Sequence, residues 1–193
     1  MKEIAETGYW NGETAHIHHV HSQELSKWIC EFFEKNIEKH HKIIDCGAGL
    51  GNYLKDLQNK GFKNLLGIEG DPSKNKVFSN IIKQDLTIPF LNLPKNSDVN
   101  VISLEVGEHI PAEYMDAYLD NICNNCSNYL ITSWAIRGQA GFGHVNCLDN
   151  HEIIPLIEKR GFKLMEKETE EVRNIDLSEA PWFKNTLLIF KRK

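Results

Sequence analysis

Short apolar runs alternate with amphipathic segments along most of the chain. Apolar residues three and four positions apart predict an amphipathic helix over residues 22–39, with Ser22 as its N-cap. Runs rich in β-branched residues predict five strands, at 42–46, 64–69, 81–85, 98–104 and 128–133. Helices are expected between them at 50–60, from about 73 to 80, and at 111–123. The remaining crossover, 87–94, is short and holds two prolines, which disfavours a helix there.

The alternation of strands and helices stops after residue 133. A glycine-rich loop is expected over 134–146, followed by a helix over 149–160 that ends at Gly161. Two further strands are expected at 162–169 and 183–191, with little helix between them. The predicted fold class is therefore α/β, a Rossmann-like seven-stranded, mostly parallel doubly wound sheet with an antiparallel edge pair.

Composition narrows the class of protein. Hydrophobic residues make up 41% and charged residues 25% of the 193, as in soluble globular proteins. No apolar run approaches the roughly 20 residues of a membrane span, and residues 1–6 lack the apolar core of a secretory signal. With five cysteines and no expected export signal, we predict a reduced, cytoplasmic setting. The net charge of -5 disfavours a nucleic-acid partner.

Neither repeats nor a low-complexity linker divide the chain. We therefore predict one domain over residues 1–193, with an N-terminal lid and helix in 1–40 and a core in 41–193. Cys123 and Cys126 have the spacing of zinc ligands but no accompanying second pair, so two cysteines at a helix end are the preferred interpretation.

The run Asp45-Cys46-Gly47-Ala48-Gly49-Leu50-Gly51 follows the first predicted strand. Its glycines allow the backbone to approach a bulky ligand, because no Cβ intervenes. A dinucleotide fingerprint would need a glycine at position 52, where this chain has Asn52. The pattern acid-x-Gly-x-Gly-x-Gly instead resembles the first motif of class I S-adenosylmethionine-dependent methyltransferases, which implies both a cofactor and a reaction.

Ligands of parallel α/β sheets bind outside the carboxyl ends of the strands, and acidic residues stand at these ends. The resemblance implies that Glu69, next to Gly70, accepts from the ribose hydroxyls of S-adenosylmethionine, and that Asp85 and the Leu86 backbone meet the adenine. The methionine end and the reacting methyl group are expected beside Asp45, Gly47, Ala48, Gly49 and Glu105.

Two histidines are candidates for the chemistry. His109 follows the fourth strand and His144 lies in the glycine-rich loop, and both loops open at the same end of the sheet. Methyl transfer to a hydroxyl needs a base, and histidine titrates near working pH. We predict this catalytic role for both, with Gln139 and Asn146 as partners of the acceptor. The alternatives are an incidental His144 in a surface loop and a His109 that caps the next helix.

Metal ligation and aromatic stacking are further alternatives at these positions. The two histidines with Glu105 or Glu108 have the residue types of a divalent-metal site, although no metal is predicted. The histidines of residues 16–21, with Tyr9 and Trp10, are interpreted as a lid, as metal ligands or as solvated side chains. Trp134 and Trp182 are interpreted either as a stacking wall for a sugar ring or as core residues.

Three longer runs are similar to one subgroup of the methyltransferase class. They are Ser103–Pro111, Ser133–Ala135 with Gly138-Gln139 and Gly143–Asn146, and Pro181–Leu187. Ala140 stands where relatives often have glycine. Many relatives are associated with sugar and glycan modification, so the resemblance implies O-methylation of a sugar, glycan or other small hydroxylated acceptor. A protein or nucleic-acid methyltransferase and an inert cofactor-binding module are the rival functions.

Overall fold

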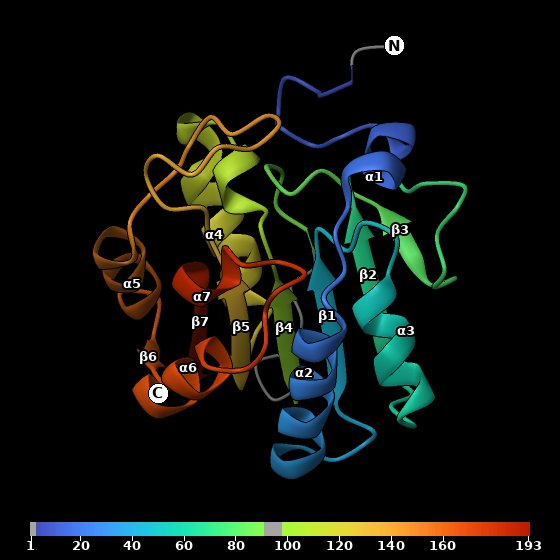
Figure 1. The fold of residues 1–193 in the computed structure, drawn as a ribbon, viewed down its shortest axis with the longest axis vertical. Helices are drawn as coiled ribbons and strands as arrows, with labels where there is room; N and C mark the ends of the chain where they lie inside the picture. Colours follow the sequence, from blue (N-terminus) through green and yellow to red (C-terminus); the bar gives the residue numbers. More distant parts are fainter. Residues whose placement is uncertain (1–2, 91–97) are drawn as a thin grey trace.

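Seven strands form a single mixed sheet in a computed structural model that describes residues 3–90 and 98–193 (Figure 1). The strand order is β3-β2-β1-β4-β5-β7-β6, and β7 runs in the opposite direction to the other six strands. The strands are β1 Lys42–Cys46, β2 Leu65–Glu69, β3 Ile81–Lys83, β4 Val99–Ser103, β5 Tyr129–Ser133, β6 Phe162–Leu164 and β7 Leu187–Arg192. The predicted fold class is confirmed.

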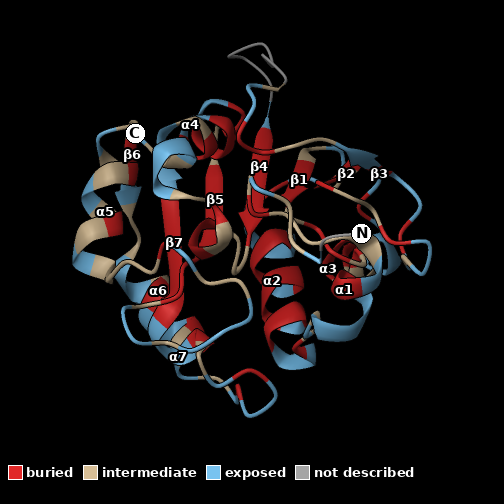
Figure 2. Cartoon of the chain, turned by 90° about the horizontal axis from the view of Figure 1, so that it is seen from above, coloured by how far each residue is buried: buried red, intermediate tan, exposed pale blue. Residues whose placement is uncertain are grey.

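Helices cover both faces of the sheet. One face packs against α2 (Gln23–Asn36), α3 (Asn52–Asn59), α6 (Glu166–Arg173) and α7 (Phe183–Thr186). The other packs against α4 (Met115–Asn124) and α5 (Asn150–Glu158). Successive strand residues point to opposite faces, so Ile43 joins the first core and Ile44 the second. Strands β4 and β5 are buried along their whole length, as Figure 2 shows.

The remaining helical segments are short. They are α1 (Gly12–His18) and two 3₁₀ turns, Gly107–His109 and Ala112–Tyr114, that follow β4. Helix α1 and the loop after β5 lie at the same end of the sheet in Figure 1, where the parallel strands have their carboxyl ends. No helix among the described residues is long and apolar enough to cross a membrane.

Four local predictions were wrong. The helix expected over 73–80 is absent; its residues form turns, in which the Ser73 hydroxyl accepts from the Asn75 N–H and the Asn80 amide bonds the carbonyl of Leu65. Strand β3 ends at Lys83 rather than at residue 85.

The other two errors are at the end of the chain. Residues 166–169, expected as strand, begin α6, since glutamate and lysine favour helix. Residues 183–186 form the single turn α7 before β7 starts. Of the crossover 87–94, the structure describes only residues 87–90, which contain no helix; the rest of that prediction lies outside the described residues.

Candidate active site

The turn after β1 brings backbone N–H groups against a buried carboxylate. Glu69, the last residue of β2, is 8% exposed and accepts from the N–H of Gly49 and of Gly70, each at 2.8 Å. Burial raises the pKa of Glu69, and these two bonds oppose the rise. Gly49 has φ +53°, and a Cβ on it would lie 2.3 Å from the His19 ring. The glycine therefore lets the turn pass close beneath an N-terminal histidine.

Asp45, at the end of β1, is 3% exposed. Burial raises its pKa to about 8, and the nearby Glu69 carboxylate adds to the rise. An aspartic acid that holds its proton near neutral pH becomes a carboxylate more readily when a positive group binds beside it.

The carboxylate of Asp85 is held by two threonines. Its Oδ1 accepts from the N–H and hydroxyl of Thr87, at 2.8 and 2.7 Å. Its Oδ2 accepts from the Thr7 hydroxyl at 2.6 Å. The neighbouring Leu86 is buried, and its carbonyl accepts from the Asn121 amide at 2.7 Å. Thr7, near the N-terminus, is thereby hydrogen-bonded to the segment that follows β3.

The segment after β4 supplies two glutamates and a histidine. Glu105 is the one described non-glycine residue with positive φ (+52°), a strained conformation that persists where surrounding contacts enforce it. Its N–H donates to the Ser133 hydroxyl at 2.8 Å, and its Oε2 accepts from the Gln139 amide at 3.0 Å. Glu108 is fully buried, which raises the pKa of its carboxyl well above the usual value.

Two imidazoles converge on Glu108 from different segments. His109 Nε2 and His144 Nε2 each lie 3.9 Å from the same oxygen, Glu108 Oε1. The ring centroids of the two histidines are 5.0 Å apart. Burial lowers the pKa of His109 to about 4, helped by the neighbouring His144. His109 is therefore neutral at pH 7.

Main-chain bonds fix the loop that carries His144. The N–H groups of Val145 and Asn146 both donate to the carbonyl of Glu108 at 2.9 Å. The carbonyl of Asn146 accepts from the indole N–H of Trp134 at 2.6 Å. Trp134 is 2% exposed and packs edge-on against Tyr118, so it is a core residue and not a wall of the site. Asn146 was expected to meet the acceptor but does not line the pocket.

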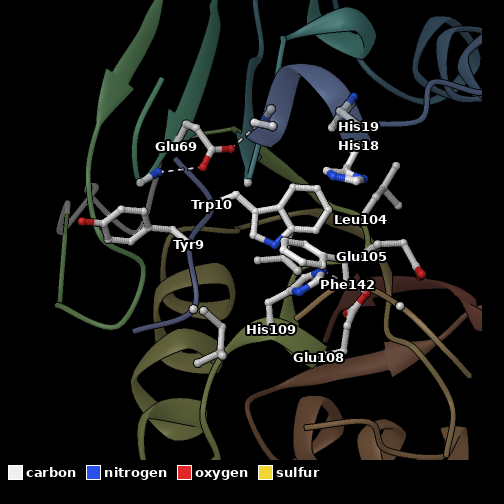
Figure 3. Close-up of a pocket in the computed structure, with 18 of the residues that line it drawn as sticks. Tyr9, Trp10, His18, His19, Glu69, Leu104, Glu105, Glu108, His109 and Phe142 are labelled. Carbon is white, nitrogen blue, oxygen red and sulfur yellow. Dashed lines mark hydrogen bonds and ion pairs between the residues drawn. The ribbon is translucent and has the colours of Figure 1, made fainter. Parts of the chain in front are cut away.

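Aromatic rings from the N-terminal segment and the glycine-rich loop cover the site (Figure 3). Trp10 lies edge-on to His109 with a centroid distance of 5.0 Å, and Phe142 stacks on His18 at 5.1 Å. His109 does not cap the following helix: its Nδ1 lies 3.2 Å from the carbonyl oxygen of Gly143 and its ring faces the site.

These groups enclose a cavity of about 310 Å³, within the range of small-molecule sites. Three comparisons bear on its identity. No known family model matches the chain, and no curated protein matches it. Solved structures do match it: a magnesium protoporphyrin IX methyltransferase from Synechocystis PCC 6803 with bound SAH has TM-score 0.62 at 16% identity, over 89% of this chain and 83% of that one.

Two further structures superpose on most of the chain. The sugar N-methyltransferase KedS8 from Streptoalloteichus has TM-score 0.63 at 11% identity, over 89% of this chain and 87% of that one. The [4+2]-cyclase SpnF has TM-score 0.59 at 14% identity, over 98% of this chain and 88% of that one. The chain has the fold of the class I methyltransferases. Because the [4+2]-cyclase has the same fold, the fold alone does not identify the reaction of this chain, and the residues of the cavity must be considered.

On this methyltransferase fold, the predicted cofactor-binding residues and both predicted catalytic histidines line one cavity. They are Asp45, Gly47, Ala48, Gly49, Glu69, Gly70, Asp85, Leu86, Glu105, His109 and His144. Trp182 also lines it, at the side formed with Phe183.

From the sequence, Glu108 was considered only as an alternative metal ligand, and no role was predicted for Phe142. The signal for Glu108 was its place beside His109 in the run Glu105-x-x-Glu108-His109 that follows the fourth strand. Cys123 and Cys126 are buried beside the end of α4, and the Cys126 thiol donates to the carbonyl of Tyr129, as expected of structural cysteines.

Proposed function

We propose that the protein is an S-adenosylmethionine-dependent O-methyltransferase that acts on a sugar, a glycan or another small hydroxylated acceptor. The observation that carries this proposal is a single cavity with two chemically distinct ends. One end has the glycine turn with the carboxylates of β1 and β2, and the other has the His109–His144 pair with Glu108.

The first end fits the cofactor. Both oxygens of Glu69 accept from main-chain N–H groups, and a carboxylate has four acceptor positions, so the group can also accept from a ribose hydroxyl. Asp45 would face the positively charged methionine part, and its ionised form would stabilise that charge. Asp85 would accept from the adenine amino group in exchange for, or beside, the Thr7 hydroxyl.

The second end fits a hydroxylated ring. Trp10 and Phe142 provide flat apolar surfaces and His18 a further flat ring, while Gln139 and Glu105 provide hydrogen-bonding groups in the same cavity. Flat rings combined with a few polar groups suit a sugar, whose faces are apolar and whose edges carry hydroxyls. The sugar acceptor named for KedS8, on the same fold, is consistent with this choice.

Bound S-adenosylmethionine would supply an electrophilic methyl group on sulfur. The residues of this chain would align the acceptor hydroxyl and assist the loss of its proton. We assign the activation of the hydroxyl to the His109–His144 pair, which meets at Glu108 on the acceptor side. Exclusion of water would come from the N-terminal segment, since Thr7, Trp10 and His19 all line the cavity.

We further propose that residues 1–40 serve as lid and first helix of a single domain whose core is 41–193. Contacts of the first residues with the strand ends support the lid: Thr7 bonds Asp85, and the N–H of Gly12 donates to Asp71 at 3.1 Å. Among the described residues, no additional helix or strand lies between the end of α2 at Asn36 and the start of β1 at Lys42.

The proposal is tested with labelled S-adenosylmethionine and a panel of sugars, glycans, nucleotides and proteins. We expect methyl transfer to a hydroxylated small molecule. Asp85→Ala should weaken binding of S-adenosylhomocysteine in calorimetry, whereas His144→Ala should reduce turnover and leave that affinity unchanged. Binding without transfer to any acceptor would favour an inert module, transfer to protein or nucleic acid would favour the rival enzymes, and absence of binding would refute all three.

A further inference from the structure

Glu108 is a buried glutamate whose carboxyl oxygens make no hydrogen bond of good geometry in the described part of the chain. Its side chain is fully buried, beside the main-chain N–H groups of Glu108 and Ala135 and the carboxyl group of Glu105. An isolated carboxylate in this environment is costly, and buried charges are normally paired or bound to a metal. A cation that reaches this side chain would therefore find acceptor positions that the protein itself does not fill.

The two neighbouring imidazoles present lone pairs to this carboxylate. His109 Nδ1 lies 3.2 Å from the carbonyl oxygen of Gly143, and His144 Nδ1 lies 3.1 Å from that of Gln139. A carbonyl only accepts, so each Nδ1 carries the proton and each Nε2 carries a free lone pair. A carbonyl behind each imidazole is also the usual arrangement of metal-binding histidines.

The distances leave space for an ion between these groups. Each Nε2 is 3.9 Å from Glu108 Oε1, too far for a hydrogen bond. The ligand atoms of Glu108, His109 and His144 all lie within 4.8 Å of one another. Ligands about 2.1 Å from one cation are themselves about 3–4 Å apart, so a small inward adjustment suffices.

The loop is shaped around the His144 ring. A Cβ on Gly141 would lie 2.1 Å from His144 Nε2, so only glycine allows the ring to occupy this place. The two main-chain bonds from residues 145 and 146 to the Glu108 carbonyl set the loop against the same turn that carries His109. The main-chain hydrogen bonds and the glycine at position 141 therefore hold the turn of Glu108 and His109 and the loop of His144 in this arrangement.

We propose that Glu108, His109 and His144 bind one divalent first-row transition-metal cation, such as Mn²⁺, Co²⁺ or Zn²⁺. Two imidazoles and one carboxylate form a ligand set that such ions favour over Mg²⁺ or Ca²⁺. Three protein ligands leave coordination positions for the cavity, which all three residues line.

The catalytic role of this ion rests on the proposed function. An acceptor hydroxyl bound to the cation loses its proton to water more readily. The resulting oxygen forms a bond to the methyl carbon while the carbon–sulfur bond breaks, and the sulfur keeps that electron pair. In this arrangement the two imidazoles activate the hydroxyl as ligands of the cation.

A second group with suitable residue types serves as the control. Asp149, His151 and Glu152 also have ligand atoms within 4.8 Å of one another. The Glu152 carboxylate, however, is bound by the Arg137 guanidinium at 2.7 and 2.9 Å and by the N–H of Asp149. His151 is exposed, and the cluster forms the capping box of α5. The two carboxylates already have partners, so we expect no ion there.

The test measures bound metal directly. Chelator-stripped protein is dialysed against Co²⁺ or Mn²⁺, and bound metal is quantified by elemental analysis, with the visible spectrum of Co²⁺ reporting its ligands. We expect one ion per chain in the wild type, and a Kd raised at least about 100-fold by Glu108→Gln and by His144→Ala. His151→Ala and His16→Ala, which remove exposed histidines, should leave the stoichiometry and Kd unchanged.

Each outcome of these measurements either supports or refutes the metal site. Absence of bound metal in the wild type, or wild-type affinity in Glu108→Gln, overturns the metal site. Calorimetry with S-adenosylhomocysteine on the same samples shows that each variant is folded. It also separates the two proposals: metal binding without cofactor binding would refute the proposed function alone, and cofactor binding without metal would refute the metal site alone.

Discussion

Replacing Asp45 by asparagine should make the stability of the protein less dependent on pH. The side chain is 3% exposed and its pKa is about 8, against an ordinary value of 3.8. In the folded protein the carboxyl group therefore keeps its proton over a range in which the unfolded chain has lost it. Stability is unaffected below about pH 4 and falls as the pH rises from there to about 8.

The magnitude follows from the two pKa values. At 1.36 kcal/mol per pKa unit, Asp45 lowers the free energy of unfolding by about 2 kcal/mol at pH 5 and by about 5 kcal/mol at pH 8. The asparagine of the variant cannot ionise, so this decrease in the free energy of unfolding does not occur in the variant. The difference in unfolding free energy between Asp45→Asn and the wild type should therefore shift by about 3 kcal/mol in favour of the variant between pH 5 and pH 8.

Urea unfolding of both proteins at several pH values measures this difference. Asp116→Asn is the matched control, since that side chain is 82% exposed and its partner is Arg160 at the surface; its effect should stay within about 1 kcal/mol at every pH. If Asp45→Asn and the wild type differ by the same amount at pH 5 and pH 8, the carboxyl group is not held protonated by burial, and the reasoning fails.

Three other variants test separate contacts. Gly49→Ala should lower the melting temperature more than Gly61→Ala, because both glycines have positive φ but only Gly49 lies against another side chain, the His19 ring. Trp134→Phe loses a buried indole hydrogen bond and should reduce the unfolding free energy by about 1–3 kcal/mol in chemical denaturation. In chelator-treated protein at pH 8, Glu108→Gln should raise the melting temperature, because it removes a buried ionisable group whose pKa is raised; an unchanged or lower value would contradict the burial argument.

The succession of strands along the chain and the strand-end acids could be predicted because they depend on local pattern. Apolar runs ended by an acid and a turn identified Asp45 and Glu69, and parallel pairing then placed both at one end of the sheet. The same reasoning failed for residues 166–169 and 183–186. Residues 166–169 begin a helix whose glutamates and lysine favour that conformation, and 183–186 form one helical turn before β7; in both places the strand pattern was extended past the strand itself.

The central place of Glu108 could not be obtained from the sequence for a different reason. Its environment is made by His109, next to it in the chain, and by His144, which reaches it through a loop fixed by main-chain bonds. Those bonds depend on φ angles and on carbonyl directions that residue identity does not specify. The covering by Trp10 and Phe142 likewise depends on how two distant loops meet.

The sheet ends in three-residue strands on both sides, β3 and β6, each of which carries a lysine, Lys83 and Lys163. Few unpaired main-chain groups are thus available to a strand from another molecule, and a charged side chain stands beside them. Both borders of the sheet therefore have features that disfavour the addition of a strand from another molecule.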